Sequence, residues 1–281
     1  MRVAIFGAGA LGSVIGALLS RRNEVLLITR GEHLKSIREN GLKVTGITEG
    51  IFHLEAESYY PGGYDLIILT VKAYDTEEAI ENIKREYKGE AIMTFQNGVG
   101  IVDMLSNFDV IPGVTTHGAT LISPGVVRHA GYGDTYIGEK NGEISERVLM
   151  IARNFTECGL KTEVVNDIME RRWIKAAINA CINPLTAVLG VKNGRLLNEN
   201  LREIMKGIGE ECSIALKKRG IDADVYALAL EVVEKTKENK SSMLQDILLG
   251  RRTEVDYIVG PFIDGKCNRM MYNLVKFLEE N

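Results

Sequence analysis

The chain opens with Met1-Arg2-Val3-Ala4-Ile5-Phe6-Gly7-Ala8-Gly9-Ala10-Leu11-Gly12, and this stretch predicts a strand, a tight turn and a helix. A continuous apolar run ends at Phe6 and leads directly into a Gly-x-Gly-x-x-Gly triplet. An apolar segment at helical spacing, residues 13–19, follows the triplet. In this context the triplet is typical of dinucleotide-binding folds, whereas a bare triplet also fits an ordinary turn. We therefore expect the helix N-terminus to hold a pyrophosphate.

Each glycine of the triplet has an expected task. Gly7 permits the tight turn, Gly9 lets the backbone approach the phosphate, and Gly12 allows close packing of helix on strand. The residues predicted to contact the cofactor here are Gly7, Ala8, Gly9, Ala10, Leu11 and Gly12.

Length and composition are those of a soluble globular protein with two domains. The 281 residues are enough for two cores, and the net charge of −4 offers no basic field for nucleic acid. No apolar run reaches the length of a membrane span, and the first strand starts too early to follow a signal peptide. The four cysteines are widely separated, so we expect a cytoplasmic protein with reduced, mostly buried cysteines and no metal.

The pattern beyond the first helix predicts an open, mostly parallel sheet that completes a domain over residues 1–165. The β-rich region 110–140 is expected to finish this sheet, with antiparallel pairing at its edge. His117 and His129 lie in that region without an acid or cysteine at ligand spacing, so we interpret them as structural or surface residues. The other predicted elements are strands at 24–29, 64–72, 91–95 and 161–165, a hairpin at 42–45 and 51–54, and helices at 76–87 and 145–158.

Polar side chains follow three of these strands, on the edge where open α/β sheets bind ligands. Arg30 stands where an acidic residue would bind the ribose hydroxyls of NAD, so NADP is favoured without excluding NAD. A simply solvated arginine is the alternative. Lys72 and Asn97 end two further strands and are site candidates, although a surface lysine and an Asn-Gly turn would look the same.

From residue 166 to 281 helical periodicity dominates, and we infer an all-helical second domain. Its most informative feature is a polar stripe, Lys175, Asn179 and Asn183, spaced i, i+4, i+8 in an otherwise apolar run over residues 173–185. The stripe could be a buried structural network, a solvated face or a ligand site. Because lysine is rarely buried without a function, the ligand site is favoured.

Two later segments look unremarkable when taken alone. Residues 238–246 mark a helix break and a new start, where serines are more often caps than ligands. Residues 251–257 place several charges in one turn, which is typical of a surface helix.

With these residues assembled, the chain resembles the ketopantoate reductase (2-dehydropantoate 2-reductase) family over essentially its whole length. The resemblance rests on the order and spacing of several motifs besides the glycine triplet. They are Thr70-Val71-Lys72-Ala73, Gln96-Asn97-Gly98-Val99-Gly100, Gly113-Val114-Thr115-Thr116-His117, the stripe continued into Pro184-Leu185-Thr186, Asn193-Gly194, Ser241-Ser242-Met243-Leu244-Gln245-Asp246 and Thr253-Glu254-Val255-Asp256.

The resemblance implies a Rossmann-type domain followed by a helical domain of the 6-phosphogluconate dehydrogenase C-terminal type. It implies NADPH-dependent reduction of 2-dehydropantoate to (R)-pantoate, a step towards pantothenate and coenzyme A. By the same likeness Lys175 is the general acid, with Glu254 facing the cofactor ribose and counted among the catalytic residues. The implied cofactor contacts are Arg30, Lys72, Asn97, Ala119 and Glu254, and the implied substrate contacts are Lys175, Asn179, Asn183, Asn193, Asn97, Ser241 and Ser242.

Two other functions stay open at this point. One is a related NAD(P)-dependent dehydrogenase that acts on another 2-oxo or 3-hydroxy acid. The other is a non-catalytic NADP-sensing regulator, which the retained Lys175 disfavours because a sensor needs no buried proton donor. A homodimer formed through the helical domain is a further expectation.

Overall fold

The computed structural model describes residues 1–280, which form two compact units that are discontinuous in sequence. Unit 1 consists of Met1–Gln96 and Ile101–Met169. Unit 2 consists of Asn97–Gly100 and the chain from Glu170 onward. A single long helix, α6 (Ile168–Leu189), contains the second boundary between them.

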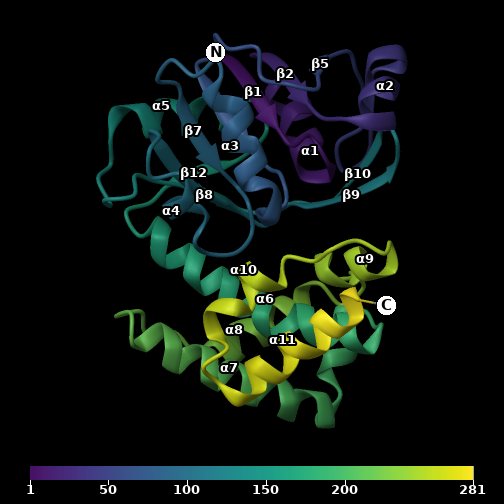
Figure 1. Cartoon of the computed structure of the whole chain (residues 1–281), viewed down its shortest axis with the longest axis vertical. Coiled ribbons are helices and arrows are strands. Elements are labelled where there is room, and N and C mark those ends of the chain that lie inside the picture. The colour runs from purple at the N-terminus through teal and green to yellow at the C-terminus, as the bar shows by residue number, and fades with distance from the viewer. Residues whose placement is uncertain (281) are drawn as a thin grey trace. The chain divides into compact units, whose positions relative to one another are not determined.

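Unit 1 is built on an eight-stranded sheet in which β1 lies between β6 and β2, third from one edge (Figure 1). The strand order is β12-β11-β8-β7-β6-β1-β2-β5, and every pairing is parallel except that of β11 with β8. Because the carboxyl ends of the parallel strands share one edge, the segments after β1, β2, β6 and β7 meet there. The strands are β1 (Arg2–Phe6), β2 (Glu24–Ile28), β5 (Glu55–Glu57), β6 (Leu66–Leu69), β7 (Ala91–Thr94), β8 (Val110–Thr115), β11 (Thr135–Ile137) and β12 (Thr162–Val164).

A separate four-stranded sheet, ordered β4-β3-β10-β9, corrects part of the sequence prediction. The predicted hairpin of β3 (Leu42–Gly46) and β4 (Gly50–Phe52) is present. However, β9 (Gly118–Ser123) and β10 (Val126–Gly131) do not complete the main sheet. Instead β10 pairs in parallel with β3, which places Val127 opposite Val44, and both side chains are buried. Burial of this apolar pair favours the second sheet, which packs against α1 (Ala10–Leu19).

The remaining helices of unit 1 follow the predicted order with small shifts at their ends. The helix predicted at 145–158 is α5 (Glu146–Glu157), and the Ser145 side chain accepts a hydrogen bond from the Val148 amide as its N-cap. The helix predicted at 76–87 ends earlier, as α3 (Thr76–Lys84). The others are α2 (Gly31–Asn40), the 3₁₀ turn η1 (Ala73–Asp75) and α4 (Ile101–Met104).

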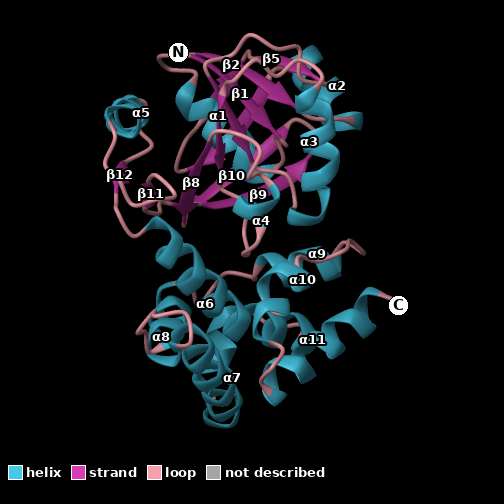
Figure 2. Ribbon diagram, turned by 60° about the vertical axis from the view of Figure 1, so that its left-hand side comes forward, coloured by secondary structure: helices cyan, strands magenta, loops and turns pink. Residues whose placement is uncertain are grey.

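Unit 2 contains helices and no strand among the residues described, as predicted (Figure 2). Its core surrounds α6, whose buried side chains include Ala177, Ala180 and Cys181. Three of the four cysteines are buried, which confirms the predicted burial, and all four are free. The helices after α6 are η2 (Asn193–Leu197), α7 (Glu199–Lys217), α8 (Val225–Lys235), α9 (Ser242–Leu248), α10 (Val255–Ile258), η3 (Gly260–Phe262) and α11 (Lys266–Glu279).

Candidate functional site

The glycine triplet forms the turn between β1 and α1 with the geometry that its spacing predicts. Gly7 has φ +93°, and a Cβ there would lie 2.4 Å from the Val71 amide nitrogen. A Cβ on Gly12 would lie 2.4 Å from Thr70 Oγ1. At Gly9 the nearest atom would be 3.9 Å away, so only this glycine faces open space. Two glycines are therefore required for packing, and the third leaves a cradle that fits a pyrophosphate.

The loop is anchored to β2. The amides of Gly7 and Ala8 both donate to the Ile28 carbonyl, at 3.0 and 2.9 Å. No side chain caps α1 at Gly9, so the first-turn amides are not satisfied by a side chain. An anion is the group that such a helix terminus accepts.

A buried bridge that sequence reasoning missed supports the loop from α2. The Gly125 amide donates to His33 Nδ1 at 2.9 Å, so this nitrogen carries no proton and Nε2 does. His33 Nε2 then donates to Ser13 Oγ at 3.2 Å, and Ser13 donates to the Ala8 carbonyl at 3.1 Å. Burial lowers the pKa of His33, which favours the neutral ring that this bridge needs.

Arg30, the predicted ligand of a 2′-phosphate, lies just after β2 and is the N-cap residue of α2. Its guanidinium forms a forked ion pair with Glu78 in the first turn of α3, at 2.9 Å from Nη1 and 3.4 Å from Nη2. Both side chains are exposed. The side chain is 69% exposed, as the alternative of a solvated arginine expects, and its fork also holds a carboxylate.

Three further predicted cofactor residues have different settings. Lys72 lies between β6, which ends at Leu69, and η1, so the strand predicted to reach Lys72 is shorter. Ala119 lies in β9, opposite His129. Asn97 directly follows Gln96, whose side chain donates to Thr76 Oγ1 at 2.8 Å and ties the end of β7 to the start of α3.

His117 and His129 are structural residues in a buried chain of hydrogen bonds. Thr48 Oγ1 lies 2.9 Å from His129 Nδ1, and His129 Nε2 lies 3.0 Å from His117 Nδ1. Burial, and secondarily the neighbouring His129, lower the pKa of His117 to about 4. His117 Nε2 has no hydrogen-bond partner among the described residues. Both rings are therefore neutral at physiological pH.

The polar stripe of unit 2 lies on α6 as predicted, and Arg172 extends it by one turn. Arg172 and Asn183 are buried, at 4% and 5% exposed, and Lys175 and Asn179 are half-buried. Within residues 1–280, the side-chain amides of Asn179 and Asn183 make no hydrogen bond to protein. Their polar atoms are not among the buried unsatisfied ones, so they are open to solvent and available to a ligand. This pattern argues against a closed structural network.

The charge at the centre of the stripe is tuned by two neighbours. The net pKa of Lys175 is lowered to about 8: burial has the largest effect, the positive charge of Arg172 also lowers the pKa, and Glu254 raises it. Glu254 is 4% exposed and precedes α10. The surface helix expected at 251–257 is therefore wrong: the helix begins only at Val255, and Glu254 is buried within range of a buried cation.

Arg172 was missed by sequence reasoning, although the spacing contains the signal. It lies three residues before Lys175, so the two share one helix face. Its Nη2 donates to the Gly98 carbonyl at 3.2 Å, and the Val99 amide donates to the Tyr257 carbonyl at 3.1 Å. Both contacts hold Asn97–Gly100 in unit 2, so Asn97 belongs to the same unit as the stripe.

The other predicted substrate residues differ in how many of their polar atoms form hydrogen bonds within the protein. Ser241 caps α9 by accepting from the Leu244 amide at 3.1 Å, and a 2.7 Å hydrogen bond joins it to Thr186 of α6. Ser242 begins α9 and is half-buried. Asn193 donates to Thr236 Oγ1 at 2.9 Å, while its buried Oδ1 has no partner among the described residues. Ser241 thus has a structural task, and Asn193 retains an unused acceptor.

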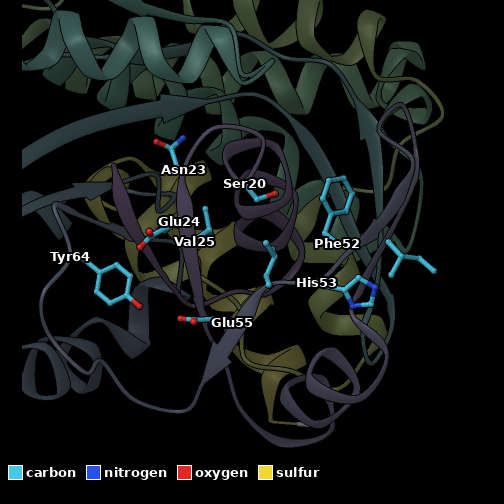
Figure 3. A pocket seen from close by; sticks show the side chains of 10 residues that line it. Ser20, Asn23, Glu24, Val25, Phe52, His53, Glu55 and Tyr64 are labelled. Carbon is cyan, nitrogen blue, oxygen red and sulfur yellow. The ribbon is translucent and has the colours of Figure 1, made fainter.

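Unit 1 contains an open hollow of about 450 Å³ (Figure 3). Because Glu24 and Val25 begin β2, it lies at the amino end of this strand, opposite the glycine loop. None of its lining residues is a predicted site residue. They are Ser20, Asn23, Glu24, Val25, Ile51, Phe52, His53, Leu54, Glu55 and Tyr64.

The described part of the chain lacks two features, a metal-binding cluster and a membrane-spanning helix. No group of three or more His, Cys, Asp or Glu side chains is arranged to hold a metal ion. No helix combines the length and the hydropathy needed to cross a bilayer.

Comparison with known proteins gives a consistent result over the whole chain. Residues 3–142 match the family model described as ketopantoate reductase PanE/ApbA, and residues 167–279 match the model of its C-terminal part. A curated relative, 2-dehydropantoate 2-reductase of Archaeoglobus fulgidus, is 39% identical, with 99% of this chain and 98% of the relative covered.

Two solved structures have the same fold. A PanE/ApbA family ketopantoate reductase from Ralstonia eutropha JMP134 is 29% identical at a TM-score of 0.92, covering 100% of this chain and 99% of that one. A D-mandelate dehydrogenase, solved with NADH and anilino(oxo)acetate, is 26% identical at a TM-score of 0.93 with the same coverage. The predicted combination of a Rossmann-type sheet with a helical C-terminal part is confirmed.

Proposed function

The chain belongs to the ketopantoate reductase family, and from this premise we propose that it reduces 2-dehydropantoate to (R)-pantoate with NADPH, in the route to pantothenate and coenzyme A. The observation that carries the proposal is Lys175, an amine whose pKa is lowered to about 8 by burial, next to two amides without protein partners. A proton donor beside unused hydrogen-bonding groups is what reduction of a polar 2-oxo acid requires.

NADPH would be held by the glycine loop and Arg30, and when bound it supplies the hydride. Reduction leaves negative charge on the former carbonyl oxygen of the substrate. Lys175 Nζ neutralises this charge by donating a proton to that oxygen. Glu254 keeps the amine protonated near neutral pH, because its negative charge raises the pKa of Lys175.

Substrate recognition is assigned to the polar groups of unit 2. The amides of Asn179 and Asn183 and the hydroxyl of Ser242 would bind the carboxylate and hydroxyl of the substrate. The unused Oδ1 of Asn193 supports acceptance of a hydrogen bond from a hydroxyl group. Ser241 is proposed to act by positioning Ser242, because its own oxygen already caps α9.

The remaining assignments concern the cofactor. We propose that Lys72 and the backbone of Ala119 contact it, that Asn97 lies between nicotinamide and substrate, and that Glu254 also faces the ribose. NADPH is proposed as the preferred coenzyme because Arg30 offers a guanidinium fork to a 2′-phosphate. Some use of NADH is proposed as well.

The decisive experiment measures NADPH oxidation by absorbance with ketopantoate and a panel of other 2-oxo acids. We expect the highest kcat/KM with ketopantoate. Binding of NADPH without turnover of ketopantoate would contradict the substrate assignment and leave the fold and the cofactor site intact.

A second candidate substrate class is favoured by one observation. The similarity to a D-mandelate dehydrogenase at a TM-score of 0.93 supports including aromatic 2-oxo acids in the panel. A preference for one of them would assign the chain to a related dehydrogenase. An NADP-sensing regulator would bind the coenzyme and turn over none of the acids.

We further propose a cytoplasmic homodimer that pairs through the helical unit. Met270, Leu274 and Phe277 are exposed at 51%, 38% and 62%, and their spacing of four and three places them on one face of α11. Exposed apolar faces of this kind are typical of interaction surfaces. Sedimentation of the wild type and Leu274→Glu tests the pairing, because a monomeric wild type would contradict it.

A further inference from the structure

The ion pair between Arg30 and Glu78 lies where the adenosine ribose of the coenzyme is expected. β1 lies between β2 and β6 in the sheet. Arg30 follows the carboxyl end of β2, and Glu78 reaches it from the first turn of α3, which follows β6 and η1. Glu78 therefore reaches across the end of β1, at the carboxyl edge of the sheet, to pair with Arg30, the residue predicted to bind the 2′-phosphate.

The geometry of the pair sets up a competition. Both Nη atoms of Arg30 point to the two oxygens of Glu78, at 2.9 and 3.4 Å. A 2′-phosphate that binds the same edge of the guanidinium must displace the carboxylate. If it binds the remaining N–H groups, it lies within a few ångströms of another negative charge.

A ribose that carries a 2′-hydroxyl meets the opposite situation. A neutral hydroxyl is not repelled. In dinucleotide folds the ribose of NAD donates hydrogen bonds to a carboxylate that follows the second strand, and the Glu78 carboxylate, although it comes from α3, lies on the residue at that position. The chain therefore places a cation suited to NADP, Arg30, in an ion pair with an anion suited to NAD, Glu78.

We propose that Glu78 is a coenzyme-specificity residue that competes with the 2′-phosphate of NADPH for Arg30 and accepts a hydrogen bond from the 2′-hydroxyl of NADH. Glu78 thereby reduces the difference in affinity between NADPH and NADH, so that the enzyme can use both coenzymes. This inference rests on the proposed function for the identity of the coenzymes.

The ion pair is easy to open, because its side chains are 69% and 67% exposed and exposed pairs are weak and screened by salt. Loss of Glu78 should therefore not disturb folding. The main effect of losing Glu78 should be a change in the affinity of Arg30 for a negatively charged ligand.

The test is the dissociation constant of each coenzyme, measured by fluorescence titration without substrate, for wild type and Glu78→Gln. We expect Glu78→Gln to bind NADPH about three- to tenfold more tightly and NADH less tightly, because a neutral amide oxygen is a weaker acceptor for the 2′-hydroxyl than a carboxylate. The gain should shrink at roughly 0.5 M salt, since exposed charges are screened there.

Glu77→Gln is the matched control, because it removes an equal charge from the neighbouring exposed residue in the same helical turn. We expect it to leave the NADPH:NADH affinity ratio within about twofold of wild type. An unchanged ratio in Glu78→Gln, weaker NADPH binding, or an equal gain in Glu77→Gln would overturn the proposal. A wild type that binds neither coenzyme would contradict the proposed function instead.

Discussion

At the scale of a single residue, Lys175 is the group proposed to donate the proton. The residue is half-buried in an apolar helix, where burial lowers the pKa of its amine, a buried arginine lowers it as well and a buried glutamate raises it. A donor poised near pH 8 can release its proton at neutral pH without being deprotonated beforehand. We expect Lys175→Ala to lose about a hundredfold or more in kcat and to retain NADPH binding.

The same residue predicts the pH profile. Because the protonated amine is the active form, kcat/KM should fall with rising pH above about 8, with the slope of one proton. Lys206→Ala, an exposed lysine on α7, is the control and should behave as wild type. A Lys175→Ala enzyme with an unchanged profile would move the proton donor elsewhere, with Glu254 or Lys72 as the next candidates.

At the scale of elements, the buried bridge from Gly125 through His33 and Ser13 joins α2 and the β9–β10 turn to the phosphate loop. Ser13→Ala leaves the His33 N–H and the Ala8 carbonyl without this partner. We expect a loss of about 1–3 kcal/mol in the free energy of unfolding and weaker NADPH binding.

Urea denaturation and coenzyme titration measure both effects of Ser13→Ala. Ser36→Ala is the control, since Ser36 lies on α2 like His33 and donates to the Pro124 carbonyl of the same β9–β10 turn through an exposed hydrogen bond. Equal losses in the two variants would show that the buried bridge has no special role.

The elements that sequence could predict are those determined by neighbours along the chain. The turn from β1 to α1 and the stripe on α6 both follow from spacing within a dozen residues. The pairing of β10 with β3 could not be predicted, because alternation identifies a strand and not its distant partner. Arg30 was recognised, yet its partner Glu78 lies 48 residues away and no local pattern joins them.

At the scale of the whole molecule, the two units are interleaved in sequence. Val99 lies between two segments of unit 1, yet its side chain is 8% exposed within the apolar core of unit 2. A local pattern could not reveal this, because the strand before it and the helix after it both belong to unit 1. Sequence position alone would therefore assign Val99 to the wrong core.

Val99→Ala should for this reason destabilise the helical unit, by about 1–3 kcal/mol from lost burial and a residual cavity. Hydrogen exchange followed by mass spectrometry should show faster exchange in α6 and α10 and unchanged exchange in β1 and β2. Val102→Ala, three residues later and buried in unit 1, should give the reverse pattern. Faster exchange in the sheet of Val99→Ala would contradict the assignment.

The two units should also differ in their sensitivity to acid, because all four histidines lie in unit 1. Burial lowers the pKa of His33 and His129 below the ordinary value, and that of His117 to about 4. Above about pH 6.5 these rings are neutral in the folded and unfolded states alike. Below about pH 6.5 these histidines bind protons in the unfolded chain but not in the folded unit, so the free energy of unfolding of unit 1 falls as the pH falls.

For His117 the loss grows from pH 6.5 down to about pH 4 and reaches on the order of 3 kcal/mol. We expect the sheet amides of unit 1 to exchange faster at pH 5.5 than at pH 7.5, after correction for the intrinsic rates, and those of α7 and α11 to change little. Carboxylates of unit 2 with lowered pKa values, such as Glu211 and Asp256, remain ionised at that pH. His117→Asn should flatten the response of unit 1, whereas equal acid sensitivity of both units would place the responsible groups outside the histidines.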